Sequence, residues 1–281
     1  MQDIKTLLGR HGFRFSKSLG QNFLTARWVP EEIVSAARLN ANTTVLEIGP
    51  GIGCLTVKLA DAAGRVVAVE LDSALLPVLA ETMKDYVNTK VIHGDILKVD
   101  LAALAETHFP GLRPVVCANL PYNITTPVLT RLIDSGLFAQ ITVMVQREVA
   151  RRITAPAGSP DYGAFSVYAA YHTEPTLHFD VPPDCFIPQP KVHSAVVTLR
   201  MREKPPVATD KDTLFRVVKA AFAQRRKTLV NCLTAALPHA SKEALTDIML
   251  TLNHDPRLRG ETLDLIAFAR ITDALLEAGM I

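Results

Sequence analysis

The sequence predicts an α/β protein, in which helices wrap a mostly parallel sheet and a small all-helical domain follows. Short β-branched runs alternate with amphipathic stretches from about residue 44 onward, which is typical of a parallel sheet with helical crossovers. The strand pattern stops at a charged stretch with two adjacent prolines, residues 202–210, and the chain after it is helical in pattern. With 281 residues, the chain is also long enough for one large domain and one small one.

Each element follows from its local pattern, and near-continuous hydrophobicity predicts strands that are buried on both faces. Strands are expected at residues 44–48, 65–70, 90–93, 114–118, 141–145 and 194–199. Helices are expected at residues 53–62, 74–85 and 125–135. Turn-forming residues at 155–163 indicate an exposed loop. The chain therefore divides into a basic N-terminal arm at 1–30, a domain built on the parallel sheet at 31–202 and a small helical domain at 203–281.

Composition excludes several classes of protein. The chain is 48% hydrophobic and 21% charged, which is typical of globular proteins and excludes disordered, collagenous and coiled-coil ones. No heptad pattern indicates a partner helix, so a monomer is expected. The sequence contains neither a signal peptide nor a long apolar run, and we expect a cytoplasmic protein with no membrane partner.

No metal or disulfide is expected. The four cysteines lie more than 40 residues apart and form no Cys-x-x-Cys pair, which argues against a disulfide framework and a thiolate zinc site and favours a reducing compartment. The eight histidines show no His-Glu-x-x-His spacing.

The strongest single motif is a glycine-rich turn, Gly49-Pro-Gly51-Ile-Gly53, which follows the first predicted strand and opens a helix. The nicotinamide fingerprint would need a glycine at position 54, where Cys54 stands. The observed spacing, preceded by the acidic Glu47, instead looks like the first motif of S-adenosylmethionine-dependent methyltransferases. A purely structural turn is the alternative, but the acids that follow later strands favour a cofactor loop.

Acidic side chains end the next two predicted strands. Glu70 closes the second strand, where a carboxylate can accept two hydrogen bonds from a ribose diol. Asp72 competes for this role but lies beyond the strand end. Asp95 follows the third strand and is placed to accept from the exocyclic amine of an adenine. Either acid alone could cap a helix, but ligands of open α/β sheets gather at the carboxyl ends of the strands.

The fourth predicted strand ends in Asn119-Leu120-Pro121-Tyr122, and this motif indicates the reaction class. Adenine N6 is a poor nucleophile because its lone pair is delocalised into the ring. The Asn119 side-chain carbonyl, together with the backbone carbonyl of Leu120 or Pro121, can accept its two N–H bonds and free the lone pair. Tyr122 offers a ring face on which the base can stack. Catalysis would then consist of positioning and electrostatics.

With these residues together, the chain resembles the ribosomal small-subunit RNA adenine dimethyltransferase family of the kasugamycin-resistance type over nearly its whole length. The matching blocks besides the cofactor set are Lys17–Leu24, Gln146–Ala150, Phe186–Val192, Ser194–Val197 and Ala221–Leu229. Leu120 separates the motif from the amino-methyltransferases of DNA and of protein glutamine, which usually carry two prolines before the tyrosine.

The resemblance implies a fold, a cofactor and a substrate. The fold would be a Rossmann-like methyltransferase sheet whose last strand is antiparallel. The residues that match the family's S-adenosylmethionine contacts are Asn22, Leu24, Gly49, Glu70, Asp95 and Asn119, to which the turn adds Gly51. The activity would be dimethylation of N6 on two adjacent adenosines near the 3′ end of 16S ribosomal RNA, within the small subunit or its precursor. Phe186 is the candidate for a second face of a base sandwich with Tyr122, unless it is an ordinary core aromatic.

Charge is segregated along the chain, although the net charge is only +2. Residues 1–30 carry a net charge of +4, residues 31–200 a net charge of −4 and residues 201–281 a net charge of +2. Arg225, Arg226 and Lys227 form a basic run where the helical pattern is expected to break, near Gln224. A solvated helix face would explain such a run, but basic ends around an acidic body favour contacts with RNA phosphates.

Two other functions stay open at this point. The basic ends would also suit a ribosome-assembly factor that acts mainly by binding the immature small subunit. The related macrolide-resistance methyltransferases act on large-subunit RNA, but the blocks at Phe186–Val197 and Arg225–Lys227 favour the small-subunit branch.

Overall fold

A computed structural model describes residues 4–13, 15 and 20–281. The described chain forms two compact units, one that runs up to Ala150 and includes Thr176–Met201, and one made of Arg151–Pro175 and Arg202–Ile281. The sequence boundary near residue 202 places residues 151–175 with the sheet. In the structure they group with the C-terminal helices, because Tyr162 and Tyr171 are buried in the core of that helical unit. Part of the matched N-terminal block, residues 17–19, lies outside the described residues.

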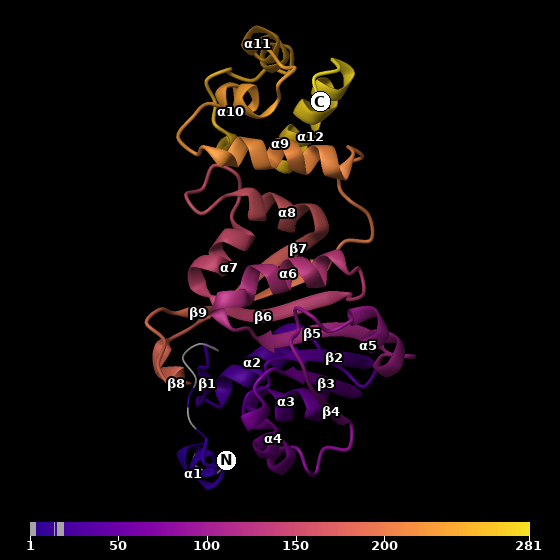
Figure 1. Cartoon of the computed structure of the whole chain (residues 1–281), viewed down its shortest axis with the longest axis vertical. Coiled ribbons are helices and arrows are strands. Elements are labelled where there is room, and N and C mark those ends of the chain that lie inside the picture. Colours follow the sequence, from indigo (N-terminus) through magenta and orange to yellow (C-terminus); the bar gives the residue numbers. More distant parts are fainter. Residues whose placement is uncertain (1–3, 14, 16–19) are drawn as a thin grey trace. The chain divides into compact units, whose positions relative to one another are not determined.

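A seven-stranded sheet forms the centre of the first unit (Figure 1). Its strands are β2 (Thr43–Ile48), β3 (Arg65–Glu70), β4 (Thr89–His93), β5 (Arg113–Asn119), β6 (Gln140–Gln146), β7 (Thr173–Val181) and β9 (Ser194–Met201). They lie in the order β4, β3, β2, β5, β6, β9, β7. The first five strands in this order, from β4 to β6, are parallel to one another, and β9 is antiparallel to β6. The expected mostly parallel sheet with a late antiparallel strand is therefore confirmed.

Two edge strands differ from expectation. β4 is only partly buried, because it is the last strand of the sheet and has a neighbour on one side only. The expectation that it is buried on both faces is wrong. β7, at the opposite edge, was not expected at all, because several of its side chains are polar and exposed and give no apolar run.

Helices cover the sheet because their apolar stripes match its apolar rows. Val45 pairs with Val66 on one side and Val115 on the other, which gives a row on one sheet face, and this row packs against Ile33 and Leu59. The helices and short turns of this unit are α1 (Ile4–Arg10), α2 (Trp28–Ala37), α3 (Cys54–Ala62), η1 (Ser73–Leu75), α4 (Leu76–Thr82), α5 (Leu101–His108), η2 (Tyr122–Ile124), α6 (Thr125–Asp134) and η3 (Pro183–Cys185). Two short strands, β1 (Phe23–Leu24) and β8 (Phe186–Ile187), pair with each other apart from the main sheet. Helix α7 (Arg147–Thr154) runs from the first unit into the second.

The second unit is helical, as expected. Its elements are α8 (Ala164–His172), α9 (Lys211–Ala223), α10 (Leu229–Ala236), α11 (Lys242–Thr251), η4 (Gly260–Thr262) and α12 (Leu265–Glu277). The side chains that accept from the first-turn backbone N–H groups of α9 to α12 are Asp210, Thr228, Ser241 and Asp264, in that order. Helix α9 ends at Ala223, next to Gln224, near which the break was predicted, and Lys227 N–H donates to the Gln224 carbonyl in the turn that follows.

The predicted loop at residues 155–163 is irregular, but one of its side chains is buried. Tyr162 is 4% exposed, and its hydroxyl donates to the Leu263 carbonyl at 2.8 Å. This loop is therefore anchored to the helical core.

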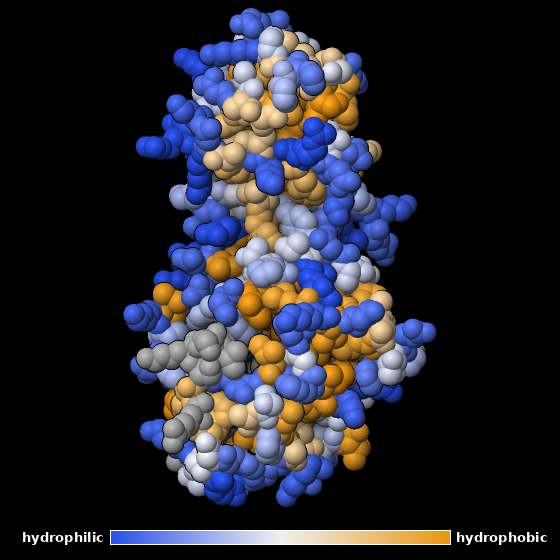
Figure 2. Space-filling model, viewed as in Figure 1, coloured by the Kyte–Doolittle hydropathy of each residue, from blue (hydrophilic) through white to orange (hydrophobic). Residues whose placement is uncertain are grey.

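The surface is mixed in polarity. Figure 2 shows hydrophilic side chains interspersed with smaller apolar patches on the face that it presents. Within the described part of the chain, no helix is both long enough and apolar enough to cross a membrane.

Candidate active site

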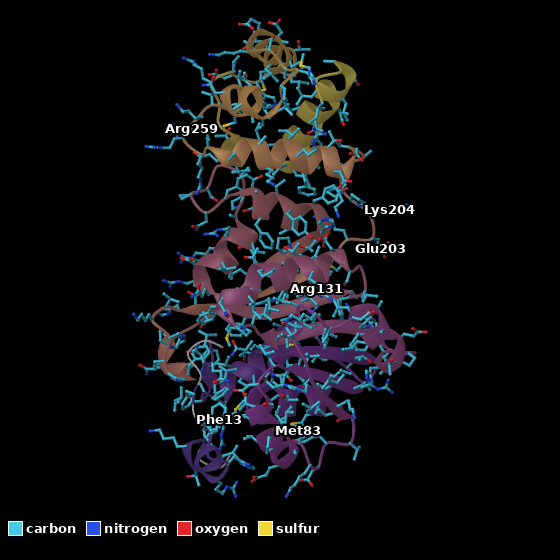
Figure 3. The ribbon with its side chains drawn as sticks, viewed as in Figure 1. Phe13, Met83, Arg131, Glu203, Lys204 and Arg259 are labelled. Atoms are coloured by element: carbon cyan, nitrogen blue, oxygen red, sulfur yellow. The ribbon has the colours of Figure 1, made fainter. Side chains whose placement is uncertain are left out.

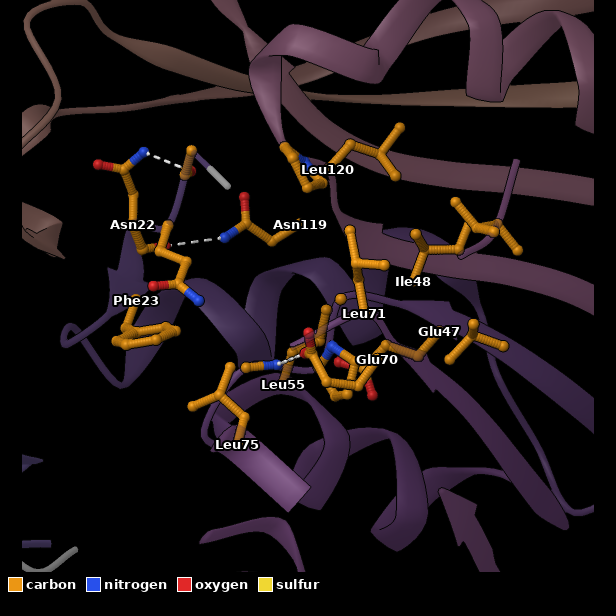
Figure 4. Close-up of a pocket in the computed structure, with 18 of the residues that line it drawn as sticks. Asn22, Phe23, Glu47, Ile48, Leu55, Glu70, Leu71, Leu75, Asn119 and Leu120 are labelled. Atoms are coloured by element: carbon orange, nitrogen blue, oxygen red, sulfur yellow. Dashed lines mark hydrogen bonds between the residues drawn. The ribbon is translucent and has the colours of Figure 1, made fainter. Parts of the chain in front are cut away.

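One pocket of the first unit opens at the carboxyl ends of the parallel strands. It is lined by residues 20–24, by the glycine turn after β2, by the loops after β3 and β4, and by the segment after β5. All seven predicted cofactor residues line it: Asn22, Leu24, Gly49, Gly51, Glu70, Asp95 and Asn119. Figure 4 labels Asn22, Glu70 and Asn119 among them. The four residues of the predicted catalytic motif, Asn119 to Tyr122, line it as well. Residues distant in sequence are thus brought together where the sequence predicts a site.

The glycine turn has a backbone that favours glycine. Gly49, Gly51 and Gly53 have φ angles of 64°, 62° and 88°, a region that other residues rarely adopt. A Cβ atom on Gly51 would also lie 3.0 Å from the Phe23 ring. The turn therefore brings the backbone close to the pocket and lets an aromatic ring pack on it.

Glu70 is held by backbone donors at the end of β3. Its Oε2 accepts from Gly51 N–H at 3.1 Å, and its Oε1 accepts from Asp72 N–H at 2.8 Å. Burial raises the pKa of Glu70, and these two hydrogen bonds counteract that effect. Each oxygen accepts one backbone bond and retains capacity for another, so the carboxylate can still receive the two hydroxyls of a diol.

The competing acid, Asp72, does not line the pocket, whereas Glu70 does. The Asp72 carboxylate accepts from Gln21 Nε2 at 2.7 Å and from Ala74 N–H at 3.0 Å, where it caps η1. The position of the two side chains therefore favours Glu70 over Asp72 as the acid for a ribose.

Asp95 lies just past β4, half-buried, and lines the pocket. Its Oδ1 accepts from Leu97 N–H at 3.0 Å, and its Oδ2 lies 3.7 Å from Lys98 Nζ. One carboxylate oxygen is thus used to fix the loop, and the side chain still borders the pocket. The apolar Leu71 and Ile96 also line the pocket and suit the faces of a purine.

The Asn119 amide has a defined orientation. Its Nδ2 donates to the Asn22 carbonyl at 3.2 Å (Figure 4), which leaves the Oδ1 as the group that can accept from a ligand. The adjoining backbone carbonyls differ. Pro121 O already accepts from Thr125 Oγ1 at 3.1 Å and Ile124 N–H at 3.3 Å, whereas no hydrogen bond to the Leu120 carbonyl is found within the described residues. The structure therefore favours Leu120 over Pro121 as the second acceptor.

Tyr122 is anchored through its hydroxyl. The Tyr122 Oη lies 2.6 Å from Ser194 Oγ, and Ser194 is fully buried at the start of β9. Burial raises the pKa of Tyr122, so the phenol stays neutral at physiological pH. This contact fixes one end of the ring.

Residues 20–24 form a strap across the pocket. Phe23 and Leu24 pair with Ile187 and Phe186, and Thr25 N–H donates to the Cys185 carbonyl at 2.8 Å. The Phe23 side chain is 6% exposed and packs against the glycine turn. Sequence reasoning did not assign Phe23 to the site, because an aromatic that packs on a turn carries no chemical signal.

Phe186 does not present a ring face to the pocket. Its side chain is 1% exposed and belongs to the hydrophobic core of the first unit, and it does not line the pocket. The expected stacking role is not borne out by this geometry, because the side chain is covered by the core while its backbone pairs with Leu24. Phe186 instead anchors the strap.

Glu47, the acid before the glycine turn, is 1% exposed and lines the floor of the pocket. Its Oε2 has no hydrogen-bond partner within the described residues. Burial, with a contribution from the nearby Glu70 carboxylate, raises the pKa of Glu47 to about 8. At neutral pH it is therefore mostly a neutral acid, a property that the motif alone did not indicate.

The basic run of the helical unit contains two kinds of residue. The Arg225 guanidinium donates to the Pro160 carbonyl at 2.6 Å and the Tyr162 carbonyl at 2.9 Å, and pairs with Glu261 at 3.2 Å. Arg226 and Lys227 are exposed in the turn between α9 and α10. The predicted phosphate contact of Arg225 therefore competes with three internal partners, whereas its two neighbours face solvent.

Another exposed cation lies near this run. Arg259 projects from the loop between α11 and α12 (Figure 3), 4.0 Å from Glu261. Within the described residues, no group of three or more His, Cys, Asp or Glu side chains could hold a metal ion.

The sequence matches the family described as "Ribosomal RNA adenine dimethylase" over residues 12–269. It is 46% identical to "Ribosomal RNA small subunit methyltransferase A" of Geobacillus thermodenitrificans over 277 residues, which cover 97% of this chain and 94% of that protein. It is 44% identical to the protein of the same name from Alkaliphilus metalliredigens, over 95% of this chain and 94% of that one.

Solved structures agree with these relatives. A dimethyladenosine transferase from Plasmodium falciparum superposes with a TM-score of 0.78 at 26% identity, over 92% of this chain and 98% of that one. The 23S rRNA methyltransferase ErmE superposes with a TM-score of 0.71 at 25% identity, over 90% and 99%. Given this fold, this pocket and a match over nearly the whole length, the chain belongs to the ribosomal RNA adenine dimethylase family.

Proposed function

We propose that the protein transfers methyl groups from S-adenosylmethionine to N6 of two adjacent adenosines near the 3′ end of 16S ribosomal RNA. The observation that carries this proposal is the oriented Asn119 amide, whose Oδ1 is left to accept from a ligand beside the Leu120 carbonyl. Two acceptors side by side match the two N–H bonds of an exocyclic amine.

The pocket fits the proposed cofactor. A methyl donor of this class carries a ribose diol, an adenine and a charged amino acid part. Glu70 retains two acceptor positions for the diol, and Asp95 borders the pocket where an adenine amine could donate. Leu71 and Ile96 offer apolar contact to the purine. The residues present thus fit the ribose diol and the adenine of such a cofactor.

When bound, the cofactor supplies an electrophilic methyl group on a sulfonium. Asn119 Oδ1 and the Leu120 carbonyl accept from the adenine amine and direct its lone pair toward that methyl group. Tyr122, held by Ser194, supports the base from one side. The proton of the methylated nitrogen passes to solvent, so no strong base is needed. The protein contributes position and electrostatics, which is how enzymes assist weak nucleophiles.

Small-subunit RNA is favoured over large-subunit RNA as the substrate. The two relatives that are 44% and 46% identical over nearly their full length are named as small-subunit methyltransferases, whereas the 23S rRNA methyltransferase ErmE is 25% identical. The exposed Arg226 and Lys227 are suited to contact RNA phosphates.

The direct test uses small ribosomal subunits that lack these methyl groups. Incubation with methyl-labelled S-adenosylmethionine is expected to place label on N6 of adenosine, and primer extension is expected to locate it at two adjacent positions near the 3′ end. Label elsewhere in the RNA, or none on the subunit, would overturn the proposal.

Replacing Asn119 tests the proposed chemistry. Asn119→Ala removes one of two acceptors and is expected to lower the transfer rate by about 100-fold or more, the usual cost of losing one preorganised polar group. Binding of S-adenosylhomocysteine, followed by calorimetry, is expected to weaken far less. Full transfer activity in this variant would contradict the role of Asn119. The same variant shows whether binding to immature subunits is separable from catalysis.

A further inference from the structure

Among the described residues, the strap at residues 20–24 is held by the buried side chains of Phe23 and Leu24 and by hydrogen bonds on its two sides. On one side, its two strand residues pair with β8, and the Asn22 carbonyl accepts from Asn119. On the other side, Gln21 Nε2 donates to Asp72 Oδ2 at 2.7 Å. The strap therefore bridges the segment after β5 and the loop after β3, and the Gln21 side chain contributes a contact with the latter.

Asp72 is a rigid acceptor for this contact. Its Oδ1 accepts from Ala74 N–H at 3.0 Å and thereby caps η1, which fixes the direction of the carboxylate. With the Asp72 side chain fixed in this way, its Oδ2 faces the Gln21 amide. A hydrogen bond to a charged and preoriented acceptor is stronger than one between neutral groups.

Asp72 is also connected to the ribose acid. The backbone N–H of Asp72 donates to Glu70 Oε1 at 2.8 Å, and Gly51 N–H donates to Glu70 Oε2 at 3.1 Å. Phe23 of the strap packs on Gly51. The strap thus contacts both groups that orient Glu70, one through Gln21 and the other through the phenylalanine ring.

We propose that Gln21 and Asp72 form a latch that holds the strap closed over the pocket and sets how long bound S-adenosylmethionine stays there. This inference rests on the proposed function, since it assumes that the pocket takes that cofactor. Gln21 and Asp72 act here as positioning residues: they hold Asn22 and Leu24 in the pocket wall and fix the loop that orients Glu70.

The latch predicts a specific kinetic effect. Breaking the hydrogen bond between Gln21 and Asp72 removes no other side chain that lines the pocket, so the ligand still binds while the strap is closed. The strap then opens more often, and the bound ligand leaves faster. Gln21→Ala is expected to raise the Kd for S-adenosylhomocysteine about tenfold, which corresponds to about 1.4 kcal/mol, mostly through a faster dissociation rate.

A double-mutant cycle separates a latch from two independent contacts. Titration calorimetry with S-adenosylhomocysteine gives the Kd, and stopped-flow displacement gives the dissociation rate. Gln21→Ala, Asp72→Ala and the double variant are compared with the unmodified chain. If the two side chains act through each other, the double variant is no weaker than Asp72→Ala alone.

Asp72→Ala also removes a helix cap, and a matched control variant measures the effect of cap loss alone. Asp100 caps α5 by accepting from Ala102 and Ala103 N–H, and it does not line the pocket. Asp100→Ala is expected to leave the Kd within about twofold of the unmodified value, because cap loss by itself affects local stability only.

Exchanging the amide and the carboxylate between positions 21 and 72 tests the latch while the size of each side chain is kept. Gln21→Glu places a carboxylate against Asp72 and is expected to raise the Kd more than Gln21→Ala does. Adding Asp72→Asn restores a donor and acceptor pair, and the Kd is expected to return to within about threefold of the unmodified value. Rescue of this kind is not expected from a general loss of stability.

The outcomes are distinct. If the unmodified chain does not bind S-adenosylhomocysteine, the proposed cofactor is wrong. If it binds, the latch is overturned by an unchanged Kd in Gln21→Ala, by additive effects in the cycle, or by a change confined to the association rate. The proposed function would survive each of these three results.

Discussion

Glu47→Gln tests how a buried acid under the pocket shapes the stability of the sheet unit. The Glu47 side chain is 1% exposed, and its pKa is raised from 4.5 to about 8 because burial penalises the charged form. Between these two pH values the native chain keeps a proton that the unfolded chain has released. The contribution of Glu47 to the free energy of unfolding is therefore fully present below pH 4.5. It falls as the pH rises toward 8 and levels off above pH 8.

The size of this effect follows from the shift. Each pKa unit corresponds to about 1.4 kcal/mol, so Glu47 accounts for a loss of at most about 5 kcal/mol across that window. A glutamine does not titrate. Glu47→Gln is therefore expected to match the unmodified chain within about 1 kcal/mol near pH 5 and to be more stable by about 3 to 5 kcal/mol at pH 9.

Urea unfolding between pH 5 and pH 9 measures this difference. Trp28 is the one tryptophan of the chain and belongs to the sheet unit, where its ring packs 5.8 Å from that of Phe179. Its fluorescence therefore reports on the unit that contains Glu47. Glu106→Gln, at an exposed position on α5, is the control and is expected to show no growing difference. A Glu47→Gln difference that stays constant with pH would refute the reasoning.

Two further predictions concern single contacts. Arg225→Ala is expected to destabilise the helical unit by about 1 kcal/mol, because three internal partners lose their donor. Arg226→Ala is expected to change the stability by less than about 0.5 kcal/mol, to weaken RNA binding and to make that binding less dependent on salt. Thermal unfolding and binding titrations at several salt concentrations check both; equal unfolding temperatures would contradict the first half. Ser194→Ala is expected to lower the transfer rate several-fold with unchanged S-adenosylhomocysteine affinity, since only the Tyr122 ring loses its anchor; an equal loss of affinity would argue against this role.

Local sequence patterns were sufficient to predict most strands of the sheet. The six strands expected from apolar runs are all present, because a strand covered on both faces has to be apolar along its length. The same rule missed β7 and overstated the burial of β4, since edge strands have a neighbour on one side only. The end of α9 near Gln224 was also predictable, from a basic residue that would otherwise fall on the apolar face.

The sequence by itself determined which residues can carry the chemistry. Glu70 and Asn119 each end a strand and Asp95 lies just past one, and parallel strands bring their carboxyl ends to one edge of a sheet. Their proximity follows from the topology, and the pocket contains them all.

The tertiary structure decided how these groups are used. Asp72 is disfavoured because it does not line the pocket, and Pro121 is disfavoured because its carbonyl already accepts two hydrogen bonds, from Thr125 and Ile124. Phe186 is a core residue because its side chain packs in the hydrophobic cluster of the first unit, while its backbone pairs with the strap. Hydrogen-bond capacity and burial depend on neighbours far away in the chain, and for this reason a motif can name an acceptor but only the folded chain can show whether it is free to bind a ligand.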